Sequence, residues 1–382
     1  MNNSLYRILF GFYLVILAVF TFYMIRYWNA SMTHAGLSSG RAMHVSAMVL
    51  IVFSVFVLFA MGFVRAKGIH LTCLLWCMVM IFVHIYNQER TASNYVLTLL
   101  WPILFETAFS FCKKNPYWMV SMRKFFVIIA LYGAYLFLVE QSRIEGQTNV
   151  IYFSLLTLPW LLSHKSPKIQ FVILVLFSVL IVLSLKRSSL LVMLLYWGFY
   201  GLTMLKKRSY RILTIVAIIA IVIIGPFAYD RIDNALGGRL NERVTREETN
   251  EGKNRLAIYE VTWAMIQQSS LDHLIFGHGH YGVPKDSPLQ ISAHNDFLEV
   301  IYDYGLLVFF LYLCLWLYVV KKCIKLYKED SLYFYPYAVS LSIFLIMSLV
   351  SHLILYTSYF NFIVLFWGGV EGFTYNANKE TQ

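Results

Sequence analysis

The sequence is poor in charged residues. Only 13% of its 382 positions are Asp, Glu, Lys or Arg, whereas soluble domains carry about 25%. Apolar residues make up 59% of the chain and are gathered in long uninterrupted blocks. A bilayer core needs about 20 consecutive apolar residues for each helix that crosses it. The composition therefore excludes an ordinary soluble domain and predicts an all-α polytopic membrane protein.

Cysteine and several catalytic motifs are scarce or missing as well. The five cysteines lie in or beside apolar blocks, and none lies in the hydrophilic stretch 230–292, so we expect no disulfide framework. The chain has no Asp-x-Asp pair of the kind that holds a nucleotide-sugar metal and no glycine-rich phosphate loop. These absences argue against nucleotide-dependent transfer.

The apolar blocks predict about twelve transmembrane helices. We expect them at residues 8–26, 43–64, 69–86, 93–112, 123–139, 149–163, 169–185, 189–205, 210–229, 297–320, 333–355 and 357–371. The predicted organisation is a membrane domain at 1–229, a large hydrophilic loop at 230–292, and C-terminal transmembrane helices with a short tail at 293–382. Within the loop, the apolar residues Leu256, Ile258, Tyr259, Trp263 and Ile266 recur at helical spacing and predict a docking helix over 254–268. The charges of 241–253 also favour helix, and residues 277–288, rich in Gly, Pro, His and Asp, are expected to be irregular.

The distribution of basic residues predicts the orientation. With the N-terminus in the cytoplasm, segments predicted inside hold 18 Lys and Arg, and the short outside loops hold 6. Cytoplasmic loops of membrane proteins are enriched in these residues, so both termini are predicted to be cytoplasmic and the large loop periplasmic. The same rule explains the net charge of +11 without nucleic acid as a partner.

A polar segment at the start of the predicted span 297–320 is the first candidate for chemistry. His294 and Asn295 precede three acidic residues, Asp296, Glu299 and Asp303, which share one helical face. Carboxylates on the first turns of a span cannot face lipid cheaply, so they line a pocket or pair within the bundle. A histidine with a pKa of about 6.5 can accept a proton at neutral pH. The alternative is a helix cap at Asn295 or Ser292 beside an interfacial histidine.

Basic residues form the second candidate group. Lys186 and Arg187 occupy a short outside turn, against the charge rule, and Ser188 and Ser189 follow at a helix N-terminus. This arrangement favours an anion such as phosphate, although long basic side chains also reach lipid headgroups. Arg255, at the start of the predicted loop helix, is a further phosphate ligand candidate.

The histidine-rich stretch Gly277-His-Gly-His-Tyr-Gly282 is a weaker candidate. Two histidines two positions apart can bind a transition metal together with His273 or His294. We favour a mobile glycine-rich loop over a pocket, and we expect no metal site.

These features together resemble the O-antigen polymerase and O-antigen ligase superfamily of bacterial envelope glycosyltransferases. The resemblance covers residues 170–320 and includes the Lys186-Arg187 turn, the Arg255 stretch, the large outside loop, and His294-Asn295 followed by nine residues and Gly305. It implies a GT-C-like architecture in the bacterial inner membrane. It also implies an undecaprenyl-pyrophosphate-linked oligosaccharide as donor, with neither metal nor nucleotide as cofactor, and a chain-length-determining membrane protein as a further partner.

The resemblance implies a role for each candidate residue. Lys186, Arg187 and Arg255 would bind the pyrophosphate, His294 would act as the base, and Asn295 or Glu299 would orient the imidazole or the acceptor. Val308 stands where ligases of the family carry Gly, Thr or Tyr, which favours a polymerase over a ligase. A lipid-linked oligosaccharide flippase is the alternative of another class, but the chain shows no internal symmetry.

Overall fold

The computed structural model describes residues 3–30, 36–62, 67–89, 91–140, 150–184, 186–235, 237–238, 255–351, 353–354 and 357–380. These residues form helices and turns, with no strand among them. Every apolar block that predicted a span contains a helix. The helices at these blocks are α1 (Asn3–Ala30), α2 (Gly36–Met61), α3 (Ile69–Tyr86), α4 (Ala92–Lys114), α5 (Trp118–Tyr135), which continues as the π-helix η1 (Leu136–Glu140), α6 (Val150–Leu162), α7 (Pro167–Ser184), α8 (Arg187–Lys206), α9 (Arg208–Ala235), α14 (Asp296–Lys328), α15 (Phe334–Val350) and α16 (Thr357–Glu380).

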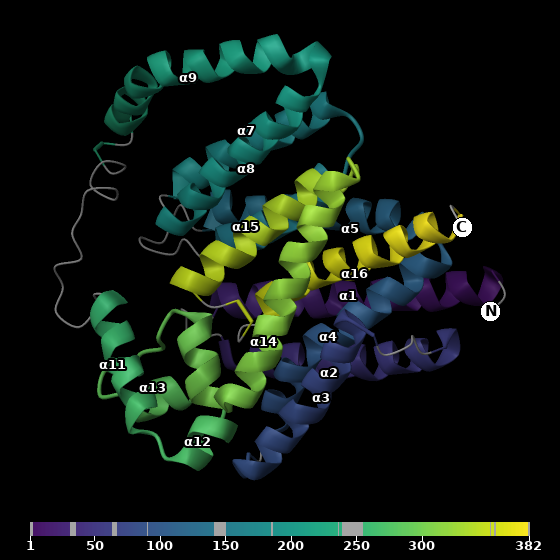
Figure 1. The fold of residues 1–382 in the computed structure, drawn as a ribbon, viewed down its shortest axis with the longest axis vertical. Helices are drawn as coiled ribbons and strands as arrows, with labels where there is room; N and C mark the ends of the chain where they lie inside the picture. The colour runs from purple at the N-terminus through teal and green to yellow at the C-terminus, as the bar shows by residue number, and fades with distance from the viewer. Residues whose placement is uncertain are drawn as a thin grey trace.

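The lengths and apolarity of these helices confirm a polytopic membrane protein. Within the described residues, eight helices are long and apolar enough to cross a bilayer, and two shorter apolar helices, Ile151–Leu162 and Phe334–Val350, accompany them. The count of twelve spans stays a prediction. In Figure 1 both termini lie at the right edge of the molecule, and the helices of the hydrophilic segment lie at the lower left.

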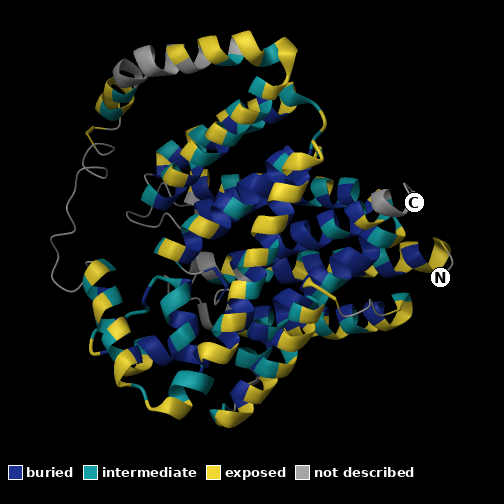
Figure 2. Ribbon diagram, viewed as in Figure 1, coloured by how far each residue is buried: buried dark blue, intermediate teal, exposed yellow. Residues whose placement is uncertain are grey.

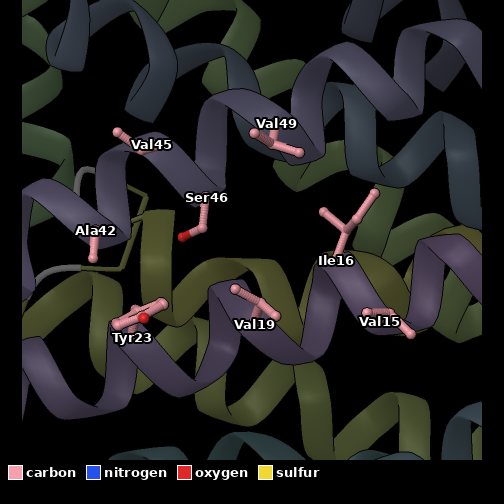
Figure 3. A pocket seen from close by; sticks show the side chains of 8 residues that line it. All are labelled: Val15, Ile16, Val19, Tyr23, Ala42, Val45, Ser46 and Val49. Atoms are coloured by element: carbon pink, nitrogen blue, oxygen red, sulfur yellow. The ribbon is translucent and has the colours of Figure 1, made fainter.

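The outer surface of the helices carries the apolar side chains that a lipid environment requires. Phe12, Val52, Ile128, Leu194 and Phe310 are all more than half exposed, which in water would be an unusually large apolar surface. An apolar groove of about 360 Å³ runs between α1 and α2, lined by Val15, Ile16, Val19, Tyr23, Ala42, Val45, Ser46 and Val49 (Figure 3). Such surfaces are stable against hydrocarbon and explain why apolar residues are not confined to the core.

The buried core is centred on α16, which packs against α4 and contacts Phe344 of α15 through Phe360 and Trp367 (Figure 2). Gly368 and Gly372, one turn apart on α16, allow a close approach to α4. A Cβ atom at Gly368 would lie 2.3 Å from the carbonyl oxygen of Phe105, and one at Gly372 would lie 2.6 Å from that of Phe109. Small residues four positions apart commonly allow membrane helices to pack closely.

Charged side chains inside the bundle are paired. His70 of α3 lies 2.9 Å from the carboxylate of Glu106 in α4, and Lys322 of α14 lies 2.5 Å from Glu371 in α16. Tyr318 also donates a 2.6 Å hydrogen bond to Glu371. Pairing reduces the cost of placing such groups in a low-dielectric environment.

The hydrophilic segment forms a small helical unit against the first part of α14. It contains α11 (Arg255–Gln268), α12 (Leu271–Phe276) and α13 (Gly282–Asp286). The docking helix predicted over 254–268 is confirmed, and the predicted helical stretch 241–253 lies outside the described residues. α11 buries Ile258, Thr262 and Ile266 in a second apolar cluster with Val283, Ala293 and Tyr302.

Two expectations for this segment were wrong in detail. Leu256 and Trp263 were grouped with the docking face, but they are 66% and 49% exposed. They lie on α11 away from the Ile258–Thr262–Ile266 stripe, which is spaced at four residues. Residues 277–288 were expected to be irregular, but five of them form α13 because Asp303 accepts a hydrogen bond from the backbone N–H of Val283.

Candidate functional site

A short, separate helix organises the candidate site. α14 begins at Asp296, where the side chain of Asn295 accepts hydrogen bonds from the N–H groups of Phe297 and Leu298. The expected N-cap at Asn295 is thereby confirmed. The helical conformation breaks at Gly305 (φ 78°, ψ 176°), and a new helical stretch follows. The nine residues between Asn295 and Gly305 are therefore one two-and-a-half-turn helix, which we call the site helix (296–304).

The break at Gly305 is filled by the glycine-rich stretch. The carbonyl groups of Tyr302 and Asp303, which lose their helical partners at the break, accept hydrogen bonds of 2.9 Å each from the N–H groups of His278 and Gly279. A Cβ atom at Gly305 would lie only 2.2 Å from the carbonyl oxygen of Ile275. Residues 277–282 therefore pack against the site helix rather than forming the loop over a pocket that the sequence suggested.

The three carboxylates of the site helix are buried, as their shared face predicts. Each accepts hydrogen bonds from the backbone of another segment. Asp296 binds the N–H groups of Leu353 and Ile354 at 3.0 to 3.2 Å, Glu299 binds the N–H of His294 at 3.2 Å, and Asp303 binds that of Val283 at 3.0 Å. The site helix thus fixes residues 353–354, the start of α13 and the backbone of His294.

His294 has an unusual backbone conformation. Its φ is 53°, in the left-handed region that non-glycine residues seldom occupy. The hydrogen bond from its N–H to Glu299 holds this conformation, and its carbonyl oxygen accepts a 3.4 Å hydrogen bond from the Tyr259 hydroxyl. Strained backbone of this kind is concentrated at functional sites.

Three groups converge on the last carbonyls of α15. Arg255 donates to the carbonyl oxygen of Val350, while the Tyr259 hydroxyl (2.8 Å) and the Asn295 amide (3.4 Å) both donate to that of Leu349. The C-terminal carbonyls of a helix lack intrahelical partners and attract cations. This convergence places Arg255 next to the segment that carries His294.

Tyr152, at the start of α6, connects the Lys186-Arg187 turn to the same place. The ammonium of Lys186 lies 4.3 Å from the centre of the Tyr152 ring, and the Tyr152 hydroxyl lies 2.6 Å from that of Ser188. Tyr152 also interacts electrostatically with Arg255 and forms a hydrogen bond with the side chain of Ser351. Arg187 begins α8, immediately after Lys186 at the N-cap.

The predicted site residues therefore occupy one neighbourhood. Arg255, His294, Asn295 and Glu299 are joined through α15 and the site helix, and Lys186 is joined to Arg255 through Tyr152. The sequence interpretation missed Tyr152, and it gave Tyr259 only an apolar packing role. It also gave Asn295 and Glu299 a role toward the imidazole, whereas the contacts found here are with backbone groups around His294.

The remaining histidines of the segment are engaged in packing. The His278 ring stacks between His273 (4.3 Å) and Tyr302 (4.1 Å), and His280 forms a hydrogen bond with the Tyr304 hydroxyl. Burial lowers the pKa of His280 to about 4, and burial together with the nearby His273 also lowers the pKa of His278. Both rings are therefore neutral at neutral pH. Within the described residues, no group of three His, Cys, Asp or Glu side chains is arranged to hold a metal ion.

The arrangement combines cations, a helix N-terminus and a histidine. Lys186, Arg187 and Arg255 can stabilise a developing negative charge, and a neutral imidazole can accept a proton from a hydroxyl group. Residues 172–313 match the family model described as O-antigen ligase. This range contains all the predicted cations, His294 and Gly305. No curated protein matches the chain.

Proposed function

We propose that this chain, whose residues 172–313 match the family model described as O-antigen ligase, polymerises a surface polysaccharide at the periplasmic face of the bacterial inner membrane. The donor is an undecaprenyl-pyrophosphate-linked glycan, and the acceptor is a sugar hydroxyl of another lipid-linked repeat unit. Both termini lie in the cytoplasm, in agreement with the distribution of Lys and Arg.

One observation supports this function most directly. Arg255, Tyr259 and Asn295 bind adjacent carbonyl groups at the end of α15. Tyr259 also binds the carbonyl oxygen of His294, and Asn295 follows His294 in the chain. A pyrophosphate ligand and a base are thereby brought close together, although 39 positions separate them in the sequence. Transfer from a lipid pyrophosphate requires this pair of functions, because the leaving group develops charge while the attacking hydroxyl loses a proton.

We assign the steps as follows. The imidazole of His294 takes the proton of the acceptor hydroxyl while its oxygen attacks the anomeric carbon of the donor sugar. The bond from that carbon to the pyrophosphate oxygen breaks, and undecaprenyl pyrophosphate leaves with its charge stabilised by Lys186, Arg187 and Arg255. Direct attack inverts the anomeric centre. The leaving group is already a weak base, so the proposal requires no cofactor.

A ligase that transfers finished chains to the lipid A core is the second candidate, because the matching family model carries that description. The structure also weakens the argument from Val308. Its side chain is fully buried in the main core, so replacing the ligase residue there affects packing rather than a surface that an acceptor contacts. The choice of polymerase depends on the acceptor and is open to a direct test.

A deletion strain separates the two candidates. If the chain is a polymerase, its loss should leave lipid A core bearing a single repeat, visible as one band above the core on a lipopolysaccharide gel. If it is a ligase, its loss should leave bare core, with long polymer still attached to the carrier lipid. Complementation with the wild-type chain should restore the full ladder. Bare core with stranded polymer would contradict the polymerase assignment, and an unchanged ladder would contradict both candidates.

Tyr152 should strengthen binding of the lipid-pyrophosphate donor. Tyr152→Phe keeps the ring beneath Lys186 but removes the hydroxyl that contacts Ser188 and Ser351. One buried hydrogen bond contributes about 1 kcal/mol, so we expect the KM for the lipid-pyrophosphate donor to rise about fivefold. Tyr152→Leu should raise it further, because the ring that contacts Lys186 is also lost.

Tyr200→Phe is the matched control for this measurement. Its hydroxyl donates a 3.2 Å hydrogen bond to the carbonyl oxygen of Pro167, near the opposite ends of α7 and α8. Equal effects of Tyr152→Phe and Tyr200→Phe on KM would show that Tyr152 contributes only to packing.

A further inference from the structure

Glu89 lies far from the predicted site residues in the sequence and outside the range that matches the family model. It follows α3 in the turn that leads to α4, and its side chain is 10% exposed. One carboxylate oxygen accepts a hydrogen bond from the backbone N–H of His280, and the other accepts one from the Asn94 amide. His84 of α3 lies 3.7 Å away. The turn between α3 and α4 therefore binds the glycine-rich stretch directly.

Hydrogen bonds connect the contact between Glu89 and His280 to the break at Gly305. His280 forms a hydrogen bond with the hydroxyl of Tyr304, the last residue of the site helix. The two preceding N–H groups, of His278 and Gly279, bind the free carbonyls of Tyr302 and Asp303. Asn87 of the same turn adds a 3.1 Å hydrogen bond to the carbonyl oxygen of Phe276. The N-terminal half of the chain thus holds the C-terminal end of the site helix.

The carboxylate of Glu89 is ionised over the physiological range. Burial opposes its charge, but the nearby His84 ring and the hydrogen bonds from Asn94 and the backbone of His280 outweigh that effect and lower its pKa to about 2. A Cβ atom at Gly279 would lie 2.9 Å from the same carboxylate, so the glycine allows the close approach. A charged acceptor binds N–H donors about twice as strongly as a neutral one.

We propose that Glu89 is a positioning residue for glycan transfer: it clamps residues 277–280, which hold the break at Gly305 and thereby the helix that fixes His294 through Glu299. Glu89 itself does not touch the cations or His294. The expected effect of Glu89 on the rate of glycan transfer rests on the proposed function. Its expected effect on residues 277–280 rests on the structure alone.

The test compares three variants of the full-length protein. Glu89→Ala removes the clamp. Glu89→Gln keeps an acceptor for the His280 N–H but places an amide against Asn94 and removes the charge beside His84. Glu106→Gln is the matched control, because Glu106 is also a carboxylate paired with a histidine, but it lies within the membrane bundle. Transfer rate, donor KM and amide hydrogen exchange are measured on each purified protein in detergent.

We expect Glu89→Ala to lower the turnover rate by about tenfold to a hundredfold, as displacement of a catalytic group by about 1 Å does. The donor KM should stay close to that of the wild type, because the cations are not displaced. Exchange of the amides of His278, Gly279 and His280 should accelerate. Glu89→Gln should show a turnover rate and an amide exchange rate between those of the wild type and Glu89→Ala. Glu106→Gln should leave the exchange of these amides unchanged.

Unchanged exchange at residues 277–280 in both Glu89 variants, or an unchanged turnover rate despite faster exchange, would overturn the proposal. A uniform rise in exchange across all helices of both variants, with a parallel fall in melting temperature, would also overturn it, since Glu89 would then support only the fold. Failure of the proposed function looks different. In that case a His294 variant would transfer glycan normally, while the amide exchange of the Glu89 variants would still report whether the clamp exists.

Discussion

Replacing His294 with Ala should abolish glycan transfer while leaving the protein inserted in the membrane at its normal level. Removal of a general base typically lowers a rate by about 10² to 10⁴, which is enough to eliminate the long bands of a lipopolysaccharide ladder. The structure supports a chemical role because His294 is held by its backbone, through Glu299 and Tyr259, and these contacts do not require the imidazole.

The backbone conformation of His294 offers a sharper version of the experiment. At φ 53°, Ala is less favourable than His, whereas Asn adopts the left-handed region readily. His294→Asn should therefore fold at least as well as the wild type and still lack the base. Loss of transfer in a His294→Asn protein of undiminished thermal stability would assign the effect to the imidazole.

The control for both variants is His164→Ala. His164 follows α6 at the end opposite Tyr152, and its ring accepts a 3.0 Å hydrogen bond from the N–H of Ser166. We expect this variant to retain the ladder. Near-normal transfer by His294→Asn, at normal protein level, would remove His294 from the base role and with it the proposed order of proton transfer.

Local sequence patterns predicted the elements of this protein well. Each apolar block contains a helix, because a run of apolar residues is sufficient to specify a membrane-spanning helix. The start of α11 and the cap at Asn295 were also predictable, because both depend on residues within one or two turns. The same holds for the burial of Asp296, Glu299 and Asp303, since carboxylates on one face near a membrane must find donors.

The partners of these residues were not predictable from local patterns. Asp296 binds backbone groups 57 and 58 positions away, and Tyr152 joins Lys186 and Ser188, at the start of α8, to Arg255, at the start of α11. Such pairings depend on how the helices pack against one another. That packing cannot be inferred from the local patterns of a single sequence. The break at Gly305 was predictable only in part. The sequence shows the spacing from His294 to Gly305, but the physical reason for the glycine is the docking of residues 275–279 against the freed carbonyl groups.

Gly305→Ala should have a large effect on the structure of the site. At φ 78° and ψ 176° the backbone lies in a region that is essentially restricted to glycine. The new Cβ atom would also lie 2.2 Å from the carbonyl oxygen of Ile275 and 2.7 Å from the backbone nitrogen of Gly277. Neither backbone atom can move without separating the glycine-rich stretch from the site helix.

We therefore expect Gly305→Ala to eliminate the polysaccharide ladder and to lower the melting temperature of the purified protein by several degrees. Backbone strain of this kind costs about 1–3 kcal/mol before the steric overlap is counted. The melting temperature can be followed by size-exclusion chromatography after heating in detergent, and the ladder by complementation of the deletion strain.

Gly201→Ala is the matched control, because Gly201 lies within α8 and a Cβ atom there would meet no atom within 4 Å. In a helix interior, Ala is favoured over Gly by about 0.5–1 kcal/mol, so this variant should be as stable as the wild type or slightly more stable, with a full ladder. If Gly305→Ala behaved like Gly201→Ala in both measurements, residues 275–279 would not be docked at the break. The path from the N-terminal half to His294 would then be absent, because it passes through that contact.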